Sequence, residues 1–217
     1  SLTYVYLSGA IQGSTLKVEN RMENLLRLSF LKINGRCDFS FLKMFPNLES
    51  LLIGDFAQID DCTFSNIGES TITELALVRT QNITDKGLII LSSMPSLVKF
   101  SIKDRLHDVT QSGWLSFAKR IEGCPSWVEL SIDDGRQINS KFFEILDREH
   151  PKLEALNVKG LNINLNSEEI MQTLKFRKSS EYYKDKTQLH WPIRYKLPSY
   201  VQRNVFKNDY YHAYTNS

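Results

Sequence analysis

The chain has 217 residues, of which 41% are hydrophobic and 24% charged, with a formal net charge of +2 at pH 7. These values are ordinary for a soluble globular protein, and the length allows one domain or one continuous array with a sizeable core. No apolar run approaches the roughly 18 residues of a membrane-spanning helix, and the first residues lack the pattern of a secretory signal. We therefore expect no membrane contact.

A triplet of apolar residues with the spacing L-x-x-L-x-L recurs along the chain, and successive copies begin 20 to 30 residues apart. The alternation within each triplet predicts a short strand with one buried face. A repeat of this length predicts stacked units, each with one strand and one return segment, that bury a continuous core between them. The seven copies are Leu2/Val5/Leu7, Leu28/Leu31/Ile33, Leu48/Leu51/Ile53, Ile72/Leu75/Leu77, Leu97/Phe100/Ile102, Trp127/Leu130/Ile132 and Leu153/Leu156/Val158.

The return segments of the later units have helical signals. In the fourth unit Thr84 and Asp85 are good N-cap residues, Leu88 and Leu91 have helical spacing, and Pro95 ends the helix. The first two units lack a clear amphipathic helix and should return through longer irregular segments. The predicted helices cover about 63–68, 85–93, 112–122, 140–148 and 167–178.

Two landmarks keep the same register with the strands. A proline stands two residues before four of the triplets, and an apolar residue follows five of the strands after a polar turn. The prolines are Pro46, Pro95, Pro125 and Pro151, and the apolar residues are Phe39, Ile59, Ile83, Val109 and Ile138.

With these landmarks, Ile83-Thr84-Asp85-Lys86-Gly87-Leu88 and Cys124-Pro125-Ser126-Trp127 resemble the cysteine-containing subclass of leucine-rich repeats over residues 1–165. The resemblance implies an α/β leucine-rich-repeat solenoid (horseshoe), with a parallel concave sheet of about seven strands and helices on the convex side. This subclass is characteristic of F-box/leucine-rich-repeat proteins, the substrate receptors of SCF-type ubiquitin ligases. The chain departs from the pattern because other residues replace the cysteine after each strand. They are Ala10, Arg36, Phe56, Thr80, Arg105, Gly135 and Leu161.

The resemblance implies an intracellular protein of the nucleus or cytoplasm that recognises a protein substrate. No F-box is present in the chain, so contact with ligase subunits would need one upstream. The exposed first repeat leads us to expect that the sequence is a C-terminal fragment of a longer protein. Two alternatives stay open: an assembly or scaffold factor of a larger complex, and a nucleic-acid or chromatin-associated module, although nucleic acid is the less favoured partner.

The residues that flank the central strand leucine should point out of the concave sheet and contact the partner protein. Aromatic side chains with a lysine are expected in the early units, and mixed charges in the middle ones, as in many interfaces. An upstream segment or the C-terminal tail could instead cover the aromatic residues. The candidate partner-binding residues are Tyr4, Tyr6, Phe30, Lys32, Lys99, Lys103, Glu129, Asp133 and Asn157.

The repeats should occupy residues 1–179, and residues 180–217 form a tail of different composition. The tail holds seven of the nine tyrosines, and residues 175–217 carry nine Lys/Arg against three acids. Disordered segments are poor in aromatic residues, so we expect the tail either to cap the last repeat or to act as an arm that contacts a partner. The candidate cap or arm residues are Trp191, Arg194, Tyr195 and Tyr200.

The sequence nominates no catalytic set, so we expect no enzyme, no metal and no cofactor. The four histidines, His107, His150, His190 and His212, lie far apart and should be surface or tail residues. The three cysteines, Cys37, Cys62 and Cys124, have no metal-like spacing and should be reduced thiols, the first two in connecting segments. The pairs Asp60-Asp61 and Asp133-Asp134 follow strands, where turn chemistry accounts for them.

Overall fold

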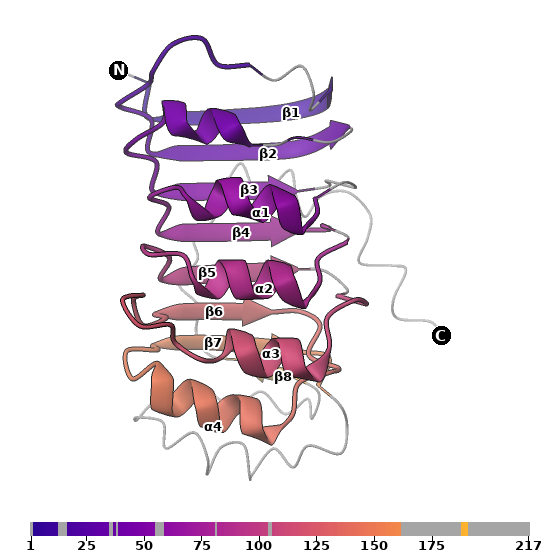
Figure 1. Ribbon diagram of the computed structural model, residues 1–217. Helices are drawn as coiled ribbons and strands as arrows, with labels where there is room; N and C mark the ends of the chain where they lie inside the picture. The colour runs from indigo at the N-terminus through magenta and orange to yellow at the C-terminus, as the bar shows by residue number, and fades with distance from the viewer. Residues whose placement is uncertain are drawn as a thin grey trace.

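The computed structural model describes residues 2–12, 17–34, 37, 39–54, 59–80, 82–103, 106–161 and 188–190. These residues form a single sheet of eight strands in sequence order (Figure 1). The first seven strands are parallel, and the eighth is antiparallel to the seventh. The strands are β1 (Tyr4–Gln12), β2 (Arg27–Asn34), β3 (Ser50–Gly54), β4 (Glu74–Val78), β5 (Lys99–Lys103), β6 (Glu129–Ile132), β7 (Ala155–Lys159) and β8 (Gln188–His190).

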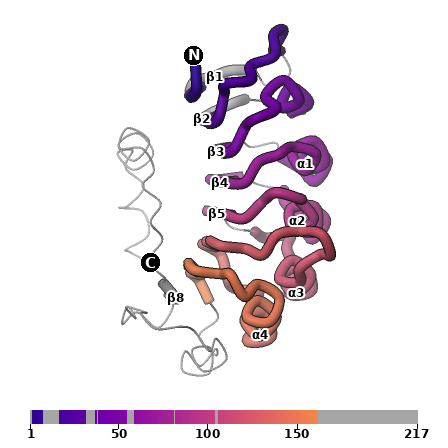
Figure 2. Tube along the Cα trace, turned by 90° about the vertical axis from the view of Figure 1, so that its left-hand side faces the viewer, coloured from indigo at the N-terminus to yellow at the C-terminus, as the bar shows by residue number. Residues whose placement is uncertain are grey.

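Parallel strands need crossover connections, and from β3 to β7 each crossover contains an α-helix. Figure 2 shows that the four labelled α-helices all lie on the same side of the sheet. A short 3-10 helix provides part of the connection between β2 and β3. The helices are η2 (Ser40–Met44), α1 (Asp61–Gly68), α2 (Asp85–Ser92), α3 (Gln111–Phe117) and α4 (Ser140–Glu149).

The expected α/β class and the parallel sheet of seven strands are confirmed. The helices α1, α2 and α4 begin and end within two residues of their predicted positions. Helix α3 ends at Phe117 instead of residue 122, because residues 119–123 are exposed and give a further turn no apolar face to bury. The helix predicted at 167–178 falls outside the described residues.

The core fills the space between the sheet and the helices. The second residues of β3 to β6, Leu51, Leu75, Phe100 and Leu130, are fully buried. Helices α3 and α4 add large aromatic side chains, so that Trp114 contacts Phe142 edge to face across the two helices, with ring centroids 6.0 Å apart. Each fully buried Leu or Phe contributes about 1.5–3 kcal/mol relative to an exposed one.

The register of β2 differs from the predicted one. Leu28 pairs with Leu51 of β3, so it is the central residue of its triplet and not the first. The triplet of this unit is therefore Leu25/Leu28/Phe30, three residues earlier than expected. A shift by an odd number of residues exchanges the two faces of a strand. The shifted register buries Phe30 against Phe39 and Phe41, with ring centroids 5.9 and 5.6 Å away.

A backbone contact that recurs at each junction holds the parallel units together. The carbonyl oxygen just before each strand accepts two amide N–H groups from the next unit, as when Thr3 accepts from Leu26 and Arg27 at 3.0 and 3.1 Å. The contact recurs at six successive junctions, so each strand begins level with its neighbour. The acceptors are Thr3, Leu26, Glu49, Thr73, Val98 and Val128.

A second set of contacts between units, which we call the helix ladder, joins the N-termini of α1, α2 and α3. The carboxylate of Asp61 accepts from the amide and hydroxyl of Thr84, at 3.1 and 2.6 Å, and Thr84 caps α2. The carboxylate of Asp85 accepts from the same groups of Thr110, at 2.8 and 2.6 Å. The carboxylate fits there because the next helix has glycine at its third position, where a Cβ on Gly113 would overlap Asp85.

His150 links two neighbouring units from inside the core and is not the surface residue that we expected. It is 2% exposed, its Nδ1 accepts from the Trp127 amide at 2.9 Å, and its Nε2 lies 3.0 Å from the Ala118 carbonyl oxygen. These contacts require a neutral ring that carries its proton on Nε2. Burial lowers the pKa of His150 to about 4, although the bond to Ala118 favours the charged form.

We expect Gly113→Ala to lower the free energy of unfolding by about 1–3 kcal/mol, because the new methyl group displaces Asp85 from Thr110 and breaks two charge-assisted bonds. Chemical denaturation followed by circular dichroism measures this loss. Gly68→Ala in α1 is the matched control, since its Cβ would meet only the Ile90 side chain, at 3.2 Å. Equal effects of the two substitutions would contradict the role of the ladder.

The low pKa of His150 also predicts a pH dependence. Between pH 6.5 and 4 the unfolded chain takes up a proton at this histidine that the folded chain does not, so stability falls as the pH falls. The loss at this residue approaches about 3 kcal/mol at pH 4. Urea denaturation across this range should show a smaller decrease for His150→Asn than for the unchanged chain, and parallel curves would refute the prediction.

Candidate functional site

The candidate site is the side of the sheet opposite the helices, which we call the distal face. Side chains alternate along each strand, so three rows of residues run across this face. The first two rows run from β1 to β7, and the last runs from β2 to β7 and includes Asp133, which directly follows β6. The first row contains Tyr4, Arg27, Ser50, Glu74, Lys99, Glu129 and Ala155; the middle row Tyr6, Ser29, Leu52, Ala76, Ser101, Ser131 and Asn157; the last row Leu31, Gly54, Val78, Lys103, Asp133 and Lys159.

Of the nine predicted partner-binding residues, seven belong to these rows. Phe30 does not, because the register of β2 turns it into the core, where it is 1% exposed. Arg27, Ser29 and Leu31 take its place on the distal face. The backbone of Lys32 lies in β2, but its side chain is outside the described part of the chain.

Three charged residues on neighbouring strands form what we call the acidic triad, Glu74, Lys99 and Glu129. The strand register places Lys99 directly between the two glutamates, and its Nζ lies 2.9 Å from Glu74 and 3.5 Å from Glu129. Burial opposes the charged form of Lys99, but the hydrogen bonds and negative charges of both glutamates outweigh burial and raise its pKa. The triad therefore fixes three partly buried charges in one row.

The opposite ends of these strands carry what we call the basic triad, Lys103, Asp133 and Lys159. The Nζ of Lys159 lies 3.3 Å from Oδ1 of Asp133, outside hydrogen-bond geometry, and this buried oxygen has no hydrogen-bond partner. Burial lowers the pKa of Lys103, and the charge of Lys159 adds to that effect while Asp133 opposes it. Two ammonium groups and one carboxylate thus interact at this end of the strands.

Small polar residues separate the two triads. Ser101, Ser131 and Asn157 in the middle row are each at least nine-tenths buried. The amide nitrogen of Asn157 donates to the Ser131 hydroxyl at 3.4 Å, whereas its Oδ1 is buried and has no hydrogen-bond partner. A buried acceptor without a donor is costly, so the packing around Asn157 carries an energetic cost.

The early strands carry an apolar cluster on the distal face. Leu31 and Leu52 form its centre, and Tyr6 and Ala76 pack against them. Tyr4 is also partly buried, and its hydroxyl lies 3.4 Å from that of Ser29. The two tyrosines therefore lie where the sequence predicts them but are only partly exposed.

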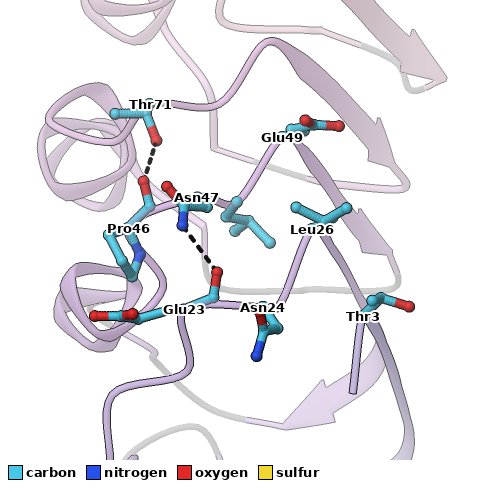
Figure 3. Close-up of a pocket in the computed structure, with 9 residues that line it drawn as sticks. Thr3, Glu23, Asn24, Leu26, Pro46, Asn47, Glu49 and Thr71 are labelled. Atoms are coloured by element: carbon cyan, nitrogen blue, oxygen red, sulfur yellow. Dashed lines mark hydrogen bonds between the residues drawn. The ribbon is translucent and has the colours of Figure 1, made fainter. Parts of the chain in front are cut away.

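A surface groove of about 630 Å³ lies at the edge where β2 and β3 begin (Figure 3). Its walls are joined by bonds between units, from Asn47 Nδ2 to the Glu23 carbonyl at 2.9 Å and from the Thr71 hydroxyl to the Pro46 carbonyl at 3.0 Å. The lining residues include two acidic ones, Glu23 and Glu49. The described hydrogen bonds of the groove connect repeats and assemble no reactive group.

The acidic pairs after the strands have structural contacts. Asp60 caps α1, and Asp61 belongs to the helix ladder. Asp134 accepts from the Leu106 amide at 3.0 Å and from two nitrogens of Arg136 at 2.7 Å. Burial of Asp134 opposes ionisation, but the hydrogen bonds and charge of Arg136 outweigh it and lower the pKa.

The remaining candidate residues form no cluster in the described part of the chain. The thiol of Cys37 is buried, that of Cys124 is partly buried, and that of Cys62 is exposed within α1, not in a connecting segment as predicted. Across the described ranges no three His, Cys, Asp or Glu residues gather as metal ligands. No helix there has the length and apolar character to cross a membrane.

Only a short part of the predicted tail lies among the described residues. Strand β8 pairs with β7, with His190 opposite Asn157 and Gln188 opposite Lys159. It therefore covers the last edge of the parallel sheet, as a cap would. Trp191, Arg194, Tyr195, Tyr200 and His212 lie outside the described residues.

No family model matches the chain, and no curated protein matches it either.

The pairing of β8 with β7 predicts different stabilities for two shortened chains. A chain that ends at Thr187 lacks β8, and one that ends at His190 keeps it. We expect the shorter chain to be less stable by roughly 1–3 kcal/mol, because the edge of β7 loses its hydrogen-bonded partner. Thermal unfolding measures the difference, and equal melting temperatures would show that β8 is not a stabilising cap.

Proposed function

We propose that the chain is a protein-recognition module with a leucine-rich-repeat solenoid fold, and that it is the substrate-binding part of an SCF-type ubiquitin ligase receptor. The repeat assignment is supported by the triplets on consecutive parallel strands and by the Thr-Asp-x-Gly sequence, whose polar groups join α2 to its neighbours. The ligase role is supported by the resemblance of these repeats to the F-box-associated subclass.

The observation that carries the recognition function is the composition of the distal face. Its apolar cluster, Leu31 and Leu52 with Tyr6 and Ala76, lies in the same sheet as the acidic and basic triads. Aromatic and apolar groups supply most of the binding energy in protein interfaces, and fixed charges select the partner. The sheet holds these groups in place before binding, so little conformational entropy would be lost.

Affinity capture of partners from cell extract tests this function. We expect Tyr6→Ser and Lys99→Glu on the distal face to remove partners that the unchanged chain retains. Ile89→Ser and Lys86→Glu are matched controls, because both residues are exposed on α2 on the opposite side of the sheet. Partners that are lost equally with the control variants would contradict a binding site on the distal face.

The same experiment tests the ligase role. The full-length gene product should capture the cullin and adaptor subunits of an SCF-type ligase together with a protein that depends on the distal face. Capture of a protein that depends on the distal face, without ligase subunits, would support the recognition function. It would contradict the ligase role and favour an assembly or scaffold factor.

A further inference from the structure

The groove at the start of β2 and β3 is lined by acidic, polar and apolar residues, and no basic residue belongs to its lining. Figure 3 shows Glu23 and Glu49 on different sides of the groove. Arg21 lies 3.7 Å from Glu23, but these two side chains are 62% and 69% exposed, so their pairing is weak. The apolar part of the lining is Leu26, Pro46 and Leu48.

Strand β8 leads the chain toward the edge of the sheet that holds this groove. It is antiparallel to β7 and ends with His190 opposite Asn157, close to the start of β7. The groove lies at the same edge, because Thr3, Leu26 and Glu49 directly precede β1, β2 and β3. The chain therefore leaves β8 in the direction of the edge where the parallel strands begin.

Residues 191–217 are long enough to reach the groove. Six strand spacings separate β8 from β2 in the sheet, which amounts to about 29 Å. An extended chain covers this distance in about nine residues, at up to roughly 3.3–3.6 Å each. Residues from about 199 onward are therefore within reach of the groove.

The segment 203–207, Arg-Asn-Val-Phe-Lys, has a pattern that complements the groove. It lies outside the described residues. In an extended segment, Arg203, Val205 and Lys207 share one side, because side chains alternate. Two basic groups then flank one apolar group, as the two glutamates of the groove accompany its apolar lining.

We propose that residues 203–207 bind in this groove of their own chain, with Arg203 and Lys207 at the two glutamates and Val205 over the apolar lining. Exposed ion pairs are individually weak. A segment tethered to the same chain has a high effective concentration, however, so a weak site is sufficient to hold it. The inference does not depend on the proposed recognition function.

Carbodiimide cross-linking of the full chain tests this proposal, because the reagent joins a lysine to a carboxylate only where the two are in contact. We expect mass spectrometry to find Lys207 joined to Glu23 or Glu49 within one copy of the chain. A mixture of isotope-labelled and unlabelled chains distinguishes this cross-link from one between two copies. Glu144, which is exposed on α4, is the control carboxylate and should give no such cross-link.

Limited proteolysis of the full chain measures the strength of the contact. Trypsin cleaves after the two basic residues of the segment only when the segment leaves the groove. We expect Glu23→Gln/Glu49→Gln to raise the initial rate of this cleavage about fivefold, because both carboxylate charges are lost. Both glutamates are exposed, so the variant should fold. The matched control is Glu122→Gln/Glu144→Gln, which changes two exposed glutamates in the units of α3 and α4 and should leave the rate unchanged.

Three results would overturn the inference. Cross-links that form only between labelled and unlabelled chains would identify a second copy as the occupant of the groove. Equal cross-linking of Lys207 to Glu144, or an unchanged rate of cleavage in the groove variant, would exclude a specific contact. A captured partner that depends on Glu23 and Glu49, in the absence of the cross-link, would assign the groove to a partner protein instead.

Discussion

The arrangement of the molecule depends on one carbonyl group in each unit, which accepts two amides from the next unit. Six successive junctions share this contact. It aligns the starts of neighbouring strands, and the strand register then fixes which residues stand opposite each other. Lys99 lies between Glu74 and Glu129 only because all three strands begin at the same level. The charge pattern of the distal face is therefore a consequence of backbone pairing.

The apolar periodicity of the sequence was sufficient to predict most of the fold. Spacing of the triplets located the strands, and α1, α2 and α4 lie within two residues of the predicted helices. It was not sufficient for β2, because Leu25, Leu28 and Phe30 have the same spacing as Leu28, Leu31 and Ile33. The contacts of Phe30 with Phe39 and Phe41 favour the observed register, and such contacts need the return segment in place.

The candidate site was predictable to the extent that it follows the register. Tyr4, Tyr6, Lys99 and Glu129 lie in the expected rows. The prediction for Phe30 was wrong, because the register of β2 differs from the predicted one and buries this side chain in the core. The sequence gives no signal for the buried role of His150, because its partners, Ala118 and Trp127, are 32 and 23 residues away along the chain. The unpaired oxygen of Asn157 is likewise a property of packing, since the residue type alone does not tell which of its polar atoms finds a partner.

The helix ladder has a consequence for how such a chain can gain or lose whole repeats. In the unit of α2, Thr84 donates to Asp61 of the preceding unit, and Asp85 accepts from Thr110 of the following unit. Removal of this unit would bring Asp61 to Thr110 and Gly113, which are equivalent to Thr84 and Gly87. Removal of the unit of α3 would instead bring Asp85 to the start of α4, where Phe142 stands at the position of Gly113. The units are therefore not interchangeable: deletion is compatible with the contacts at α2 and incompatible with them at α3.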